Sequence, residues 1–449
     1  MIAAVAAAAV ALAAAQDTTP PPRLDEARIV PGRVVRAVRA LSDSSQTYAL
    51  YLPPDYDPTG AHPLLLVLDA RGRALLPLQR LQNALAERSW IALSSYNSAS
   101  DGDEAPNRAA MNAMLADAQA HLAVDTDRLY LAGFSGTARL AWAYGYQLAP
   151  HVAGVLGFGA GLPATYDLDR ITAEMGAPFV FFGGAGEDDF NYDEMVLLEA
   201  TLERLAFPHR IASYEGPHGW PPPDVLGAGI AWLDVQAMRR GLAEPDPAFL
   251  RDAYRRDLER AAALEERGRP GPAWHAYRQA VQDFDGLIDV SEARARTAFL
   301  ESVPAVGSWR SARLTRAARY QQYGTAVAQW LGALRTADPL PSVADAALAL
   351  DVDWLVRQSR GEVGTSDEDA RAAGRRLALL YTQLSFYERR RYEEAGDLER
   401  LRLVLELAHR IRPDDPRVCA GLADAMEALG EPAADVARMR RCAPEPSGP

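Results

Sequence analysis

The hydrophobic pattern of the first half of the chain alternates short apolar runs with longer amphipathic stretches. The apolar runs are continuous, without a polar face, and occupy residues 47–53, 62–70, 90–97, 128–134, 152–161, 177–184 and 209–216. Continuous apolar runs of this length indicate strands that are buried on both sides of a sheet. Strands of this kind are typical of parallel sheets that helices cover on both faces.

The segments between these runs have helical spacing of their apolar residues. They cover residues 75–88, 107–122, 136–149, 193–206 and 227–240. Alternation of buried strands with amphipathic helices predicts an α/β domain with a mostly parallel, doubly covered sheet. Residues 27–41 carry a different pattern, which predicts one or two antiparallel strands at the edge of that sheet.

The pattern changes near residues 244–247, after which strand signals almost disappear. Residues 246–449 are rich in Ala, Leu, Glu and Arg, so we expect an α/β domain over residues 28–243 and an all-α domain after it. Small residues recur there at spacings that resemble tetratricopeptide repeats, in which Ala and Gly let paired helices approach closely. Residues 300–375 do not match this repeat.

The first 15 residues are apolar and rich in alanine, and they end in Ala13-Ala14-Ala15. This ending suits a signal peptidase, so we expect a signal peptide over residues 1–15, a proline-rich linker over residues 16–27 and export to the periplasm or medium. A frayed alanine-rich helix is the alternative, since a basic segment before the apolar stretch is missing. The stretch is short for a membrane span, and we expect none in the mature chain.

Composition limits the classes of partner. The chain is 49% hydrophobic and 24% charged, as in soluble globular proteins, and its formal net charge is −13 with arginine as its only strongly basic residue. An acidic chain repels phosphate backbones, so nucleic acid is not expected as a partner. The two cysteines, Cys419 and Cys442, are too few for a four-thiolate zinc site. They flank one predicted helical hairpin, where they form either a disulfide or two unrelated buried thiols.

One turn in the α/β half carries the pattern of a catalytic serine. The apolar run 128–134 leads directly into Gly133-Phe134-Ser135-Gly136, and a helix follows at once. This strand–turn–helix context is the one that a nucleophile elbow requires, because the glycines permit a strained turn that exposes the serine. The helix then directs its first N–H groups toward charge that develops on a substrate carbonyl, and Gly136 is the expected oxyanion donor.

A serine nucleophile needs a base and an acid, and both follow at the ends of later strands. Asp188 and Asp189 come after the run 177–184, and His218 comes after the run 209–216. The order serine, acid, histidine is the one found in sheets of this type. The other histidines lack a strand-end position of this kind, precede the elbow or lie in the helical half.

With these motifs, residues 45–240 resemble the α/β-hydrolase family, and most closely its secreted esterases and polyester depolymerases, which carry a Gly-Phe-Ser-Gly elbow and a His-Gly-Trp-Pro-like loop. The resemblance implies Ser135 as nucleophile, His218 as general base and Asp189 as the orienting acid, with Asp188 as the alternate. The elbow pattern departs at Thr137, where relatives carry a second glycine, and a β-branched residue there is expected to crowd the helix against the strand.

The second oxyanion donor is predicted from the position of a loop in the chain. The loop after the run 62–70 should supply the second oxyanion donor, through the N–H of Arg71 or Gly72. Asp69 in that loop is expected to cap the turn rather than to act as an acid.

Three further residues are candidate substrate contacts. These are Tyr96, Asn97 and Trp220, although a loop cap for the first two and a core or lid position for Trp220 are open alternatives.

The sequence therefore predicts a serine hydrolase that cleaves carboxylic esters, with no metal or organic cofactor. Small-molecule or polymeric esters are the expected substrates, and the helical half is a possible surface for a protein partner. Two alternatives to this prediction remain. The first is an inactive hydrolase-like scaffold that binds partners through its helical half, and the second is a serine peptidase of the same fold.

Overall fold

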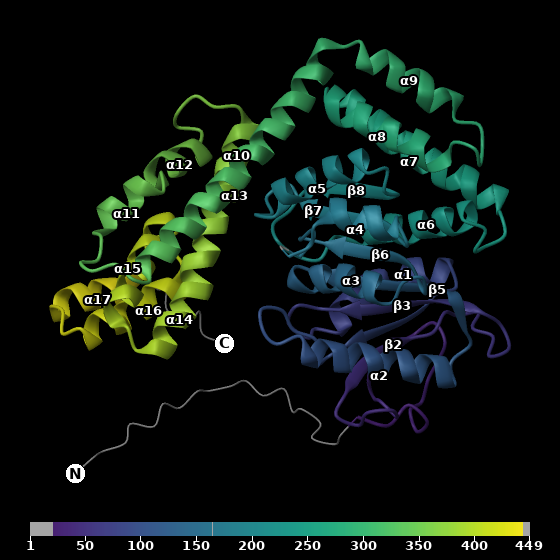
Figure 1. The fold of residues 1–449 in the computed structure, drawn as a ribbon, viewed down its shortest axis with the longest axis horizontal. Coiled ribbons are helices and arrows are strands. Elements are labelled where there is room, and N and C mark those ends of the chain that lie inside the picture. The colour runs from purple at the N-terminus through teal and green to yellow at the C-terminus, as the bar shows by residue number, and fades with distance from the viewer. Residues whose placement is uncertain (1–20, 164, 443–449) are drawn as a thin grey trace.

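The computed structural model describes residues 21–163 and 165–442; the predicted signal peptide, residues 1–15, lies outside them. The first part is built on a sheet of eight strands (Figure 1). The strands are β1 (Val34–Arg39), β2 (Thr47–Tyr51), β3 (His62–Leu68), β4 (Ile91–Ser95), β5 (Val124–Phe134), β6 (Val152–Phe158), β7 (Val180–Gly186) and β8 (His209–Tyr214).

The sheet has the order β1-β2-β4-β3-β5-β6-β7-β8. Strand β2 is antiparallel to both of its neighbours, and the remaining pairs are parallel. The edge strand expected within residues 27–41 is β1. Strands β3, β4, β6 and β7 are buried along their whole length, as their continuous apolar runs predict.

Helices cover both faces of the sheet, and two separate apolar clusters fill the spaces between. Helices α2, α3 and α5 contribute to the cluster on one face, and helices α1 and α6 to the cluster on the other. The helices of this part are α1 (Leu75–Glu87), α2 (Ala105–His121), α3 (Gly136–Gln147), α4 (Leu168–Met175), α5 (Tyr192–Arg204) and α6 (Pro223–Arg239). The chain thus has the α/β architecture expected from its sequence.

An all-α part follows and begins at a well-defined cap. The side chain of Asp246 accepts hydrogen bonds from the N–H groups of Ala248 and Phe249, and Pro247 occupies the first turn. The helices are α7 (Pro247–Glu266), α8 (Pro270–Phe284), α9 (Ser291–Glu301), α10 (Pro304–Leu334), α11 (Val343–Ala349), α12 (Val352–Ser359), α13 (Asp367–Thr382), the π-helix η1 (Gln383–Glu388), α14 (Arg389–Ala395), α15 (Leu398–Ile411), α16 (Pro416–Ala428) and α17 (Ala433–Cys442).

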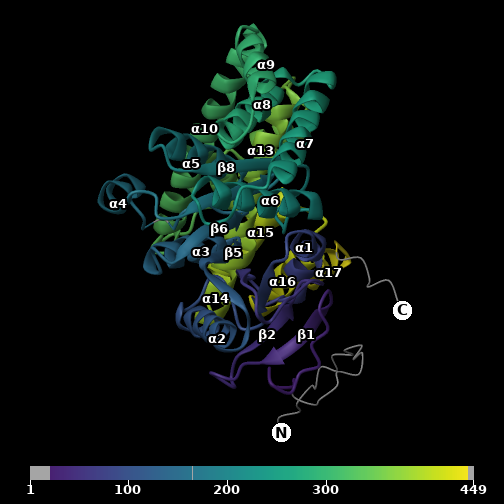
Figure 2. The ribbon, with the colours of Figure 1, turned by 90° about the vertical axis from the view of Figure 1, so that its right-hand side faces the viewer.

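The all-α part contains two apolar cores that the 31-residue helix α10 joins. One core packs helices α7 to α9 and the start of α10 against α6, and the other holds the end of α10 with the helices that follow. Figures 1 and 2 show α10 running from the α7–α9 layer to the C-terminal helices beside the sheet. Helices α7 and α8, and likewise α15 and α16, form adjacent pairs, but the long α10 interrupts any uniform two-helix repeat. The likeness to tetratricopeptide repeats therefore stays a prediction.

The predicted linker is partly packed against the sheet. Leu24 is buried in the apolar cluster, and the N–H of Arg39 donates to the carbonyl of Pro22 at 2.9 Å. The packed chain thus starts several residues before residue 28, where we expected the domain to begin. Among the described residues, none of the helices combines the length and the apolar character that a bilayer span needs.

The two cysteines are joined in a disulfide at the end of the chain. Cys419 lies in α16 and Cys442 at the end of α17, with Cα atoms 5.9 Å apart, as is usual for disulfides. The bond links two consecutive helices of the C-terminal core. Such bonds persist in oxidising compartments, and export stays a prediction.

Candidate active site

Ser135 lies in a strained turn between β5 and α3. Its φ of 58° and ψ of −129° lie in a region that non-glycine residues rarely adopt, at a cost of about 1–3 kcal/mol. The turn is tight, because a Cβ atom on Gly133 would lie 2.2 Å from the carbonyl oxygen of Thr137. The N–H of Ser135 donates to the carbonyl of Phe158 at 2.8 Å, which ties the turn to β6. Strain held by such surroundings is typical of a functional position.

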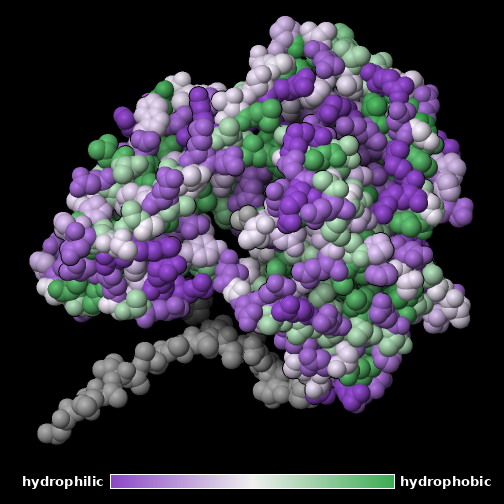
Figure 3. Space-filling model, in the orientation of Figure 1, coloured by the Kyte–Doolittle hydropathy of each residue, from purple (hydrophilic) through white to green (hydrophobic). Residues whose placement is uncertain are grey.

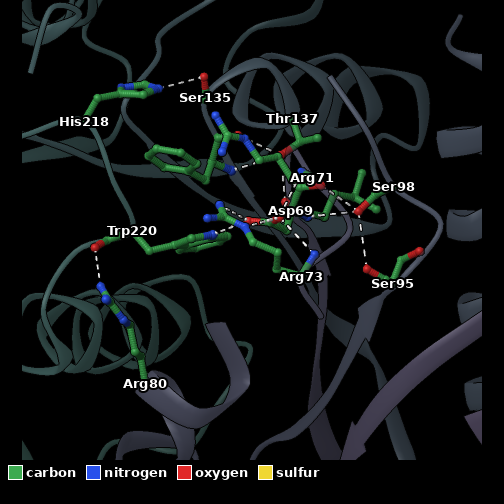
Figure 4. A network of polar contacts seen from close by, with 12 residues as sticks. Asp69, Arg71, Arg73, Arg80, Ser95, Ser98, Ser135, Thr137, His218 and Trp220 are labelled. Carbon is green, nitrogen blue, oxygen red and sulfur yellow. Dashed lines mark hydrogen bonds and ion pairs between the residues drawn. The ribbon is translucent and has the colours of Figure 1, made fainter. Parts of the chain in front are cut away.

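Thr137 does not disturb this turn. It is fully buried, and its hydroxyl lies 2.7 Å from the carbonyl oxygen of Leu68 and 2.8 Å from that of Phe134. The N–H of Phe134 donates to the same hydroxyl at 3.1 Å. The crowding that we expected from a β-branched residue is thus offset by hydrogen bonds that a glycine could not make. They tie the start of α3 to the end of β3 (Figure 4).

His218 and Asp189 complete a hydrogen-bonded chain with the serine. The Nε2 atom of His218 lies 3.0 Å from Ser135 Oγ, and its Nδ1 atom lies 2.9 Å from both carboxylate oxygens of Asp189. The three side chains come from the turn after β5, the loop after β7 and the loop after β8, which all lie at the carboxyl ends of parallel strands. This is the geometry of a nucleophile, a base and an orienting acid.

The structure separates the two candidate acids. Asp189 is fully buried, and one of its oxygens also accepts the N–H of Asn191 at 2.8 Å. Asp188 is exposed, and its backbone N–H donates to the carbonyl of Gly216. Only Asp189 is brought to His218.

Two aromatic rings hold the imidazole of His218. The ring centroids of Phe134 and Phe190 lie 4.7 Å and 4.3 Å from that of the histidine, and the His218 side chain is 23% exposed. Sequence reasoning did not single out these two residues. Each stands next to a triad residue in the sequence, which is the one signal that could have drawn attention to them.

The loop after β3 is arranged around the carboxylate of Asp69. This buried side chain accepts the N–H groups of Arg71 and Arg73, the guanidinium of Arg73 and the indole N–H of Trp220 (Figure 4). Burial alone would raise the pKa of Asp69, but the hydrogen bonds from Arg73 and Trp220 lower it below its ordinary value. Asp69 is therefore a charged cap of the loop.

This arrangement corrects our expectation for the second oxyanion donor. The N–H of Arg71 donates to the Asp69 carboxylate at 2.9 Å, and the N–H of Gly72 donates to the Asp69 carbonyl at 3.1 Å. Both groups are occupied. Gly72 has a φ of +63°, and a Cβ atom there would lie 2.4 Å from the carbonyl oxygen of Tyr96, which explains the glycine. The remaining predicted oxyanion donor is the N–H of Gly136. This residue begins α3, and the first N–H groups of a helix have no acceptor within the helix.

The three predicted substrate contacts bond to or pack against other parts of the protein. The hydroxyl of Tyr96 donates to the carbonyl of Arg36, and the side-chain oxygen of Asn97 accepts the N–H of Thr47. These bonds direct both side chains to β1 and β2. Trp220 is 5% exposed and packs against Phe134 and Phe158. Trp220 thus packs beneath the residues that surround the candidate site.

A bidentate ion pair fixes the loop after β6 beside the elbow. Arg139, on the first turns of α3, bonds both carboxylate oxygens of Glu194 at 2.6 Å and 2.7 Å. Glu194 also accepts the N–H of Gly161, and Arg139 donates to the carbonyl of Leu162. The loop is thus held close to the helix that follows Ser135.

The all-α part contacts two loops that flank the triad. From α13, Arg375 donates to the carbonyl of Glu187, two residues before the acid. From η1, the hydroxyl of Tyr387 donates to the carboxylate of Asp101 at 2.8 Å. Asp101 follows Ser100, whose side chain lies against Gly136. The rim that carries the candidate triad therefore faces α13 and η1, and the molecular surface is hollowed between the α/β part and the all-α part (Figure 3).

Two groups of side chains among the described residues have metal-ligand spacing, and neither contains a triad residue. One comprises His409 with the two disulfide cysteines, and the other comprises Glu199, Glu203 and His209.

The sheet order and the elbow together are those of the α/β-hydrolase fold. Similar solved structures include serine hydrolase F of Staphylococcus aureus, which binds fluorophosphonates, at 12% identity and a TM-score of 0.39 over 45% of this chain and 99% of that one. The S-formylglutathione hydrolase of the same organism has 13% identity and a TM-score of 0.38 over 46% and 98%. A hyperthermophilic esterase from Pyrobaculum calidifontis has 13% identity and a TM-score of 0.36 over 46% and 87%.

These neighbours are serine hydrolases and esterases, and each covers less than half of this chain. No protein-family model and no curated protein matches the sequence.

Proposed function

We propose that the chain is a serine hydrolase that cleaves carboxylic esters through an acyl-enzyme. The observation that carries this proposal is the continuous hydrogen-bonded chain from Ser135 through His218 to the buried Asp189. The strained φ of Ser135 and its position at the start of α3 support the same conclusion.

In the proposed mechanism, Nε2 of His218 takes the proton of the Ser135 hydroxyl while Oγ attacks the ester carbonyl. Asp189 binds the opposite nitrogen, which fixes the tautomer and stabilises the imidazolium that forms. The N–H of Gly136 and the dipole of α3 stabilise the oxyanion of the tetrahedral intermediate. His218 then protonates the leaving alcohol, the acyl-enzyme forms, and water activated by His218 releases the acid.

The hydrogen-bonded geometry of Ser135, His218 and Asp189 supports this proposal over an inactive scaffold. Strain at Ser135 costs free energy, and a protein that only binds partners has no need of it. Esters are preferred over peptides as substrates because of the resemblance to esterases, so this part of the proposal rests on family likeness.

Labelling with a fluorophosphonate probe tests the nucleophile. We expect labelling of the full chain at Ser135 and its loss in Ser135→Ala. Ser100→Ala is the matched control, because Ser100 lies beside the elbow and has no histidine partner among the described residues. Retained labelling in Ser135→Ala would refute the proposal.

Hydrolysis of p-nitrophenyl acyl esters and aminoacyl anilides by the same proteins tests the substrate class. We expect the esters to be cleaved with the higher kcat/KM. Cleavage of the anilides alone would support a peptidase instead.

A further inference from the structure

An arginine-lined cavity lies where the all-α part meets the sheet edge, and Ser135 is not among its lining residues. It has a volume of about 150 Å³, and residues of β8, α5, α7, α8, α10 and α13 form its walls. Both ribbon views place these elements side by side. Six arginines line the cavity, against three carboxylates; the arginines are Arg210, Arg260, Arg269, Arg313, Arg316 and Arg375. In a chain of net charge −13, this concentration of cations needs an explanation.

Some of these arginines hold the two parts of the molecule together. Arg375 is 2% exposed and bonds Asp193 at 2.6 Å, and Arg210 bonds Asp257 and Asp283. These bonds hold Arg375 and Arg210 in place as part of the cavity wall.

Three others retain unused donors. Arg313, Arg316 and Arg260 make ion-pair contacts with Glu199, Asp369 and Asp257 at 2.8 Å, 3.6 Å and 3.2 Å. Burial alone would lower the pKa of Arg313, but the charge of Glu199 and hydrogen bonds to Glu199 and Tyr192 raise it. Among the described residues, Arg316 and Arg260 have only the ion-pair contacts given above. A guanidinium group carries five N–H donors, and burial without acceptors is costly.

The exposed fractions of these side chains show which end of the cavity opens to solvent. Arg313 and Arg316, one turn apart on α10, are 14% and 13% exposed and form the floor, whereas Arg260 and Arg269 are 49% and 37% exposed and form the mouth. Burial and the charge of Arg210 lower the pKa of Arg260, against the opposing charges of Asp257 and Asp224. The donors thus converge on a space that is reached from solvent.

We propose that this cavity binds a small oxyanion, the phosphate or carboxylate group of a metabolite. Guanidinium groups match the oxygens of these anions in paired hydrogen bonds, and a convergent set of them is a typical anion site. The volume would hold several water molecules and therefore a tetrahedral phosphate or a short dicarboxylate. A ligand there would bridge α7 and α10, and it would lie beside Glu187, which precedes the triad acid by two residues.

Isothermal titration calorimetry on the full chain tests the site, with inorganic phosphate as the probe and the ionic strength held constant with sodium chloride. We expect saturable binding of one phosphate per chain. Binding should weaken about tenfold or more in Arg316→Gln, because this variant removes a floor guanidinium whose own ion pair is long. Arg319→Gln is the matched control, since Arg319 is exposed on the same helix and lies outside the cavity lining.

Arg260→Gln provides a second variant at the mouth of the cavity, where the exposed side chain can be removed even if Arg316→Gln does not fold. A parallel titration with succinate distinguishes phosphate from carboxylate, and tighter binding of either anion, lost in the variants, supports the site. The proposal is overturned if neither anion binds the wild-type chain, or if Arg316→Gln and Arg260→Gln bind as the wild type does.

Discussion

At the scale of single residues, the acid of the proposed triad differs from the neighbouring aspartate in its burial and its hydrogen bonds. Asp189 and Asp188 have the same side chain and adjacent positions, but one is buried against His218 and the other is exposed. The sequence left this choice open, because a loop can present either of two consecutive residues inward. Substitutions at the two positions should therefore have very different effects.

We expect Asp189→Asn to lower kcat for p-nitrophenyl acetate by about 10⁴-fold, because the amide favours the wrong tautomer of His218. Asp188→Asn should leave kcat within about twofold of the wild type, as expected for an exposed residue away from the reacting atoms. Equal losses in the two variants would contradict the assignment of the acid.

Asp69 is a second aspartate whose charge matters, in this case for stability. Asp69→Asn replaces an acceptor of several buried N–H groups with an amide that can accept at only one end. We expect the free energy of unfolding to fall by about 2–4 kcal/mol, measured by urea denaturation at pH 7. A loss below about 0.5 kcal/mol would show that the loop does not depend on this carboxylate.

The effect of Asp69 should also depend on pH. Because its folded-state pKa lies below the ordinary value of 3.8, the carboxylate stabilises the fold fully above that value. This contribution is lost as the pH falls through the folded-state pKa. The difference in unfolding free energy between the wild type and Asp69→Asn should therefore be largest near neutral pH and shrink below pH 3.8. An unchanged difference at pH 3 would contradict this account.

At the scale of elements, the elbow depends on the attachment of α3 to β3 through one hydroxyl. Thr137→Val keeps the shape of the side chain but removes the acceptor of the Phe134 N–H and the donor to buried carbonyls. We expect a loss of about 1–3 kcal/mol in unfolding free energy together with a lower kcat. Thr137→Ser keeps the hydroxyl and should cost only about 1 kcal/mol for the lost methyl group. Thermal denaturation of both variants compares the two effects.

Most of the α/β elements could be predicted from the sequence, because strands buried on both faces leave continuous apolar runs. The short helix α4 was not predicted, since it has only eight residues and only Leu168 among them is buried. The early start of β5 at Val124 was missed for a similar reason, because its first residues are partly exposed. Exposed elements leave little hydrophobic signal.

The positions of candidate site residues could be predicted where a sequence motif determines the local geometry. They could not be predicted where a side chain bonds to groups that are distant in the sequence. The elbow sequence determined the position of Ser135 on its turn. By contrast, the directions of Tyr96 and Asn97 depend on carbonyl and N–H groups of β1 and β2, which lie far away along the chain. The occupation of the Arg71 amide likewise depends on the direction of the Asp69 side chain, and that of the Gly72 amide on the backbone carbonyl of Asp69.

At the scale of the whole molecule, buried ion pairs join the two parts across their contact. Arg375 of α13 and Asp193 of α5 are both about 2% exposed in their side chains. Burial makes such a pair sensitive to the loss of one member, because the remaining charge is left without compensation.

Arg375→Met should therefore lower the free energy of unfolding by about 3–5 kcal/mol. Arg375→Met combined with Asp193→Leu removes both charges, and we expect it to be more stable than the single variant. Chemical denaturation followed by intrinsic tryptophan fluorescence measures both. A double variant as unstable as the single one would mean that the hydrogen bond from Arg375 to the carbonyl of Glu187, rather than the charge pair, stabilises the contact.

The ion pairs of Arg210 have a consequence for how the protein is made. This arginine lies in the last strand of the sheet at 6% exposure, and its carboxylate partners, Asp257 and Asp283, belong to α7 and α8 of the all-α part. During synthesis β8 leaves the ribosome before either partner exists. Both carboxylate partners are present only after about seventy further residues have been synthesised. A gene fragment that stops after the sheet would encode a strand with a cation and nothing to neutralise it, so the two parts of the chain can be expected to be inherited as one unit.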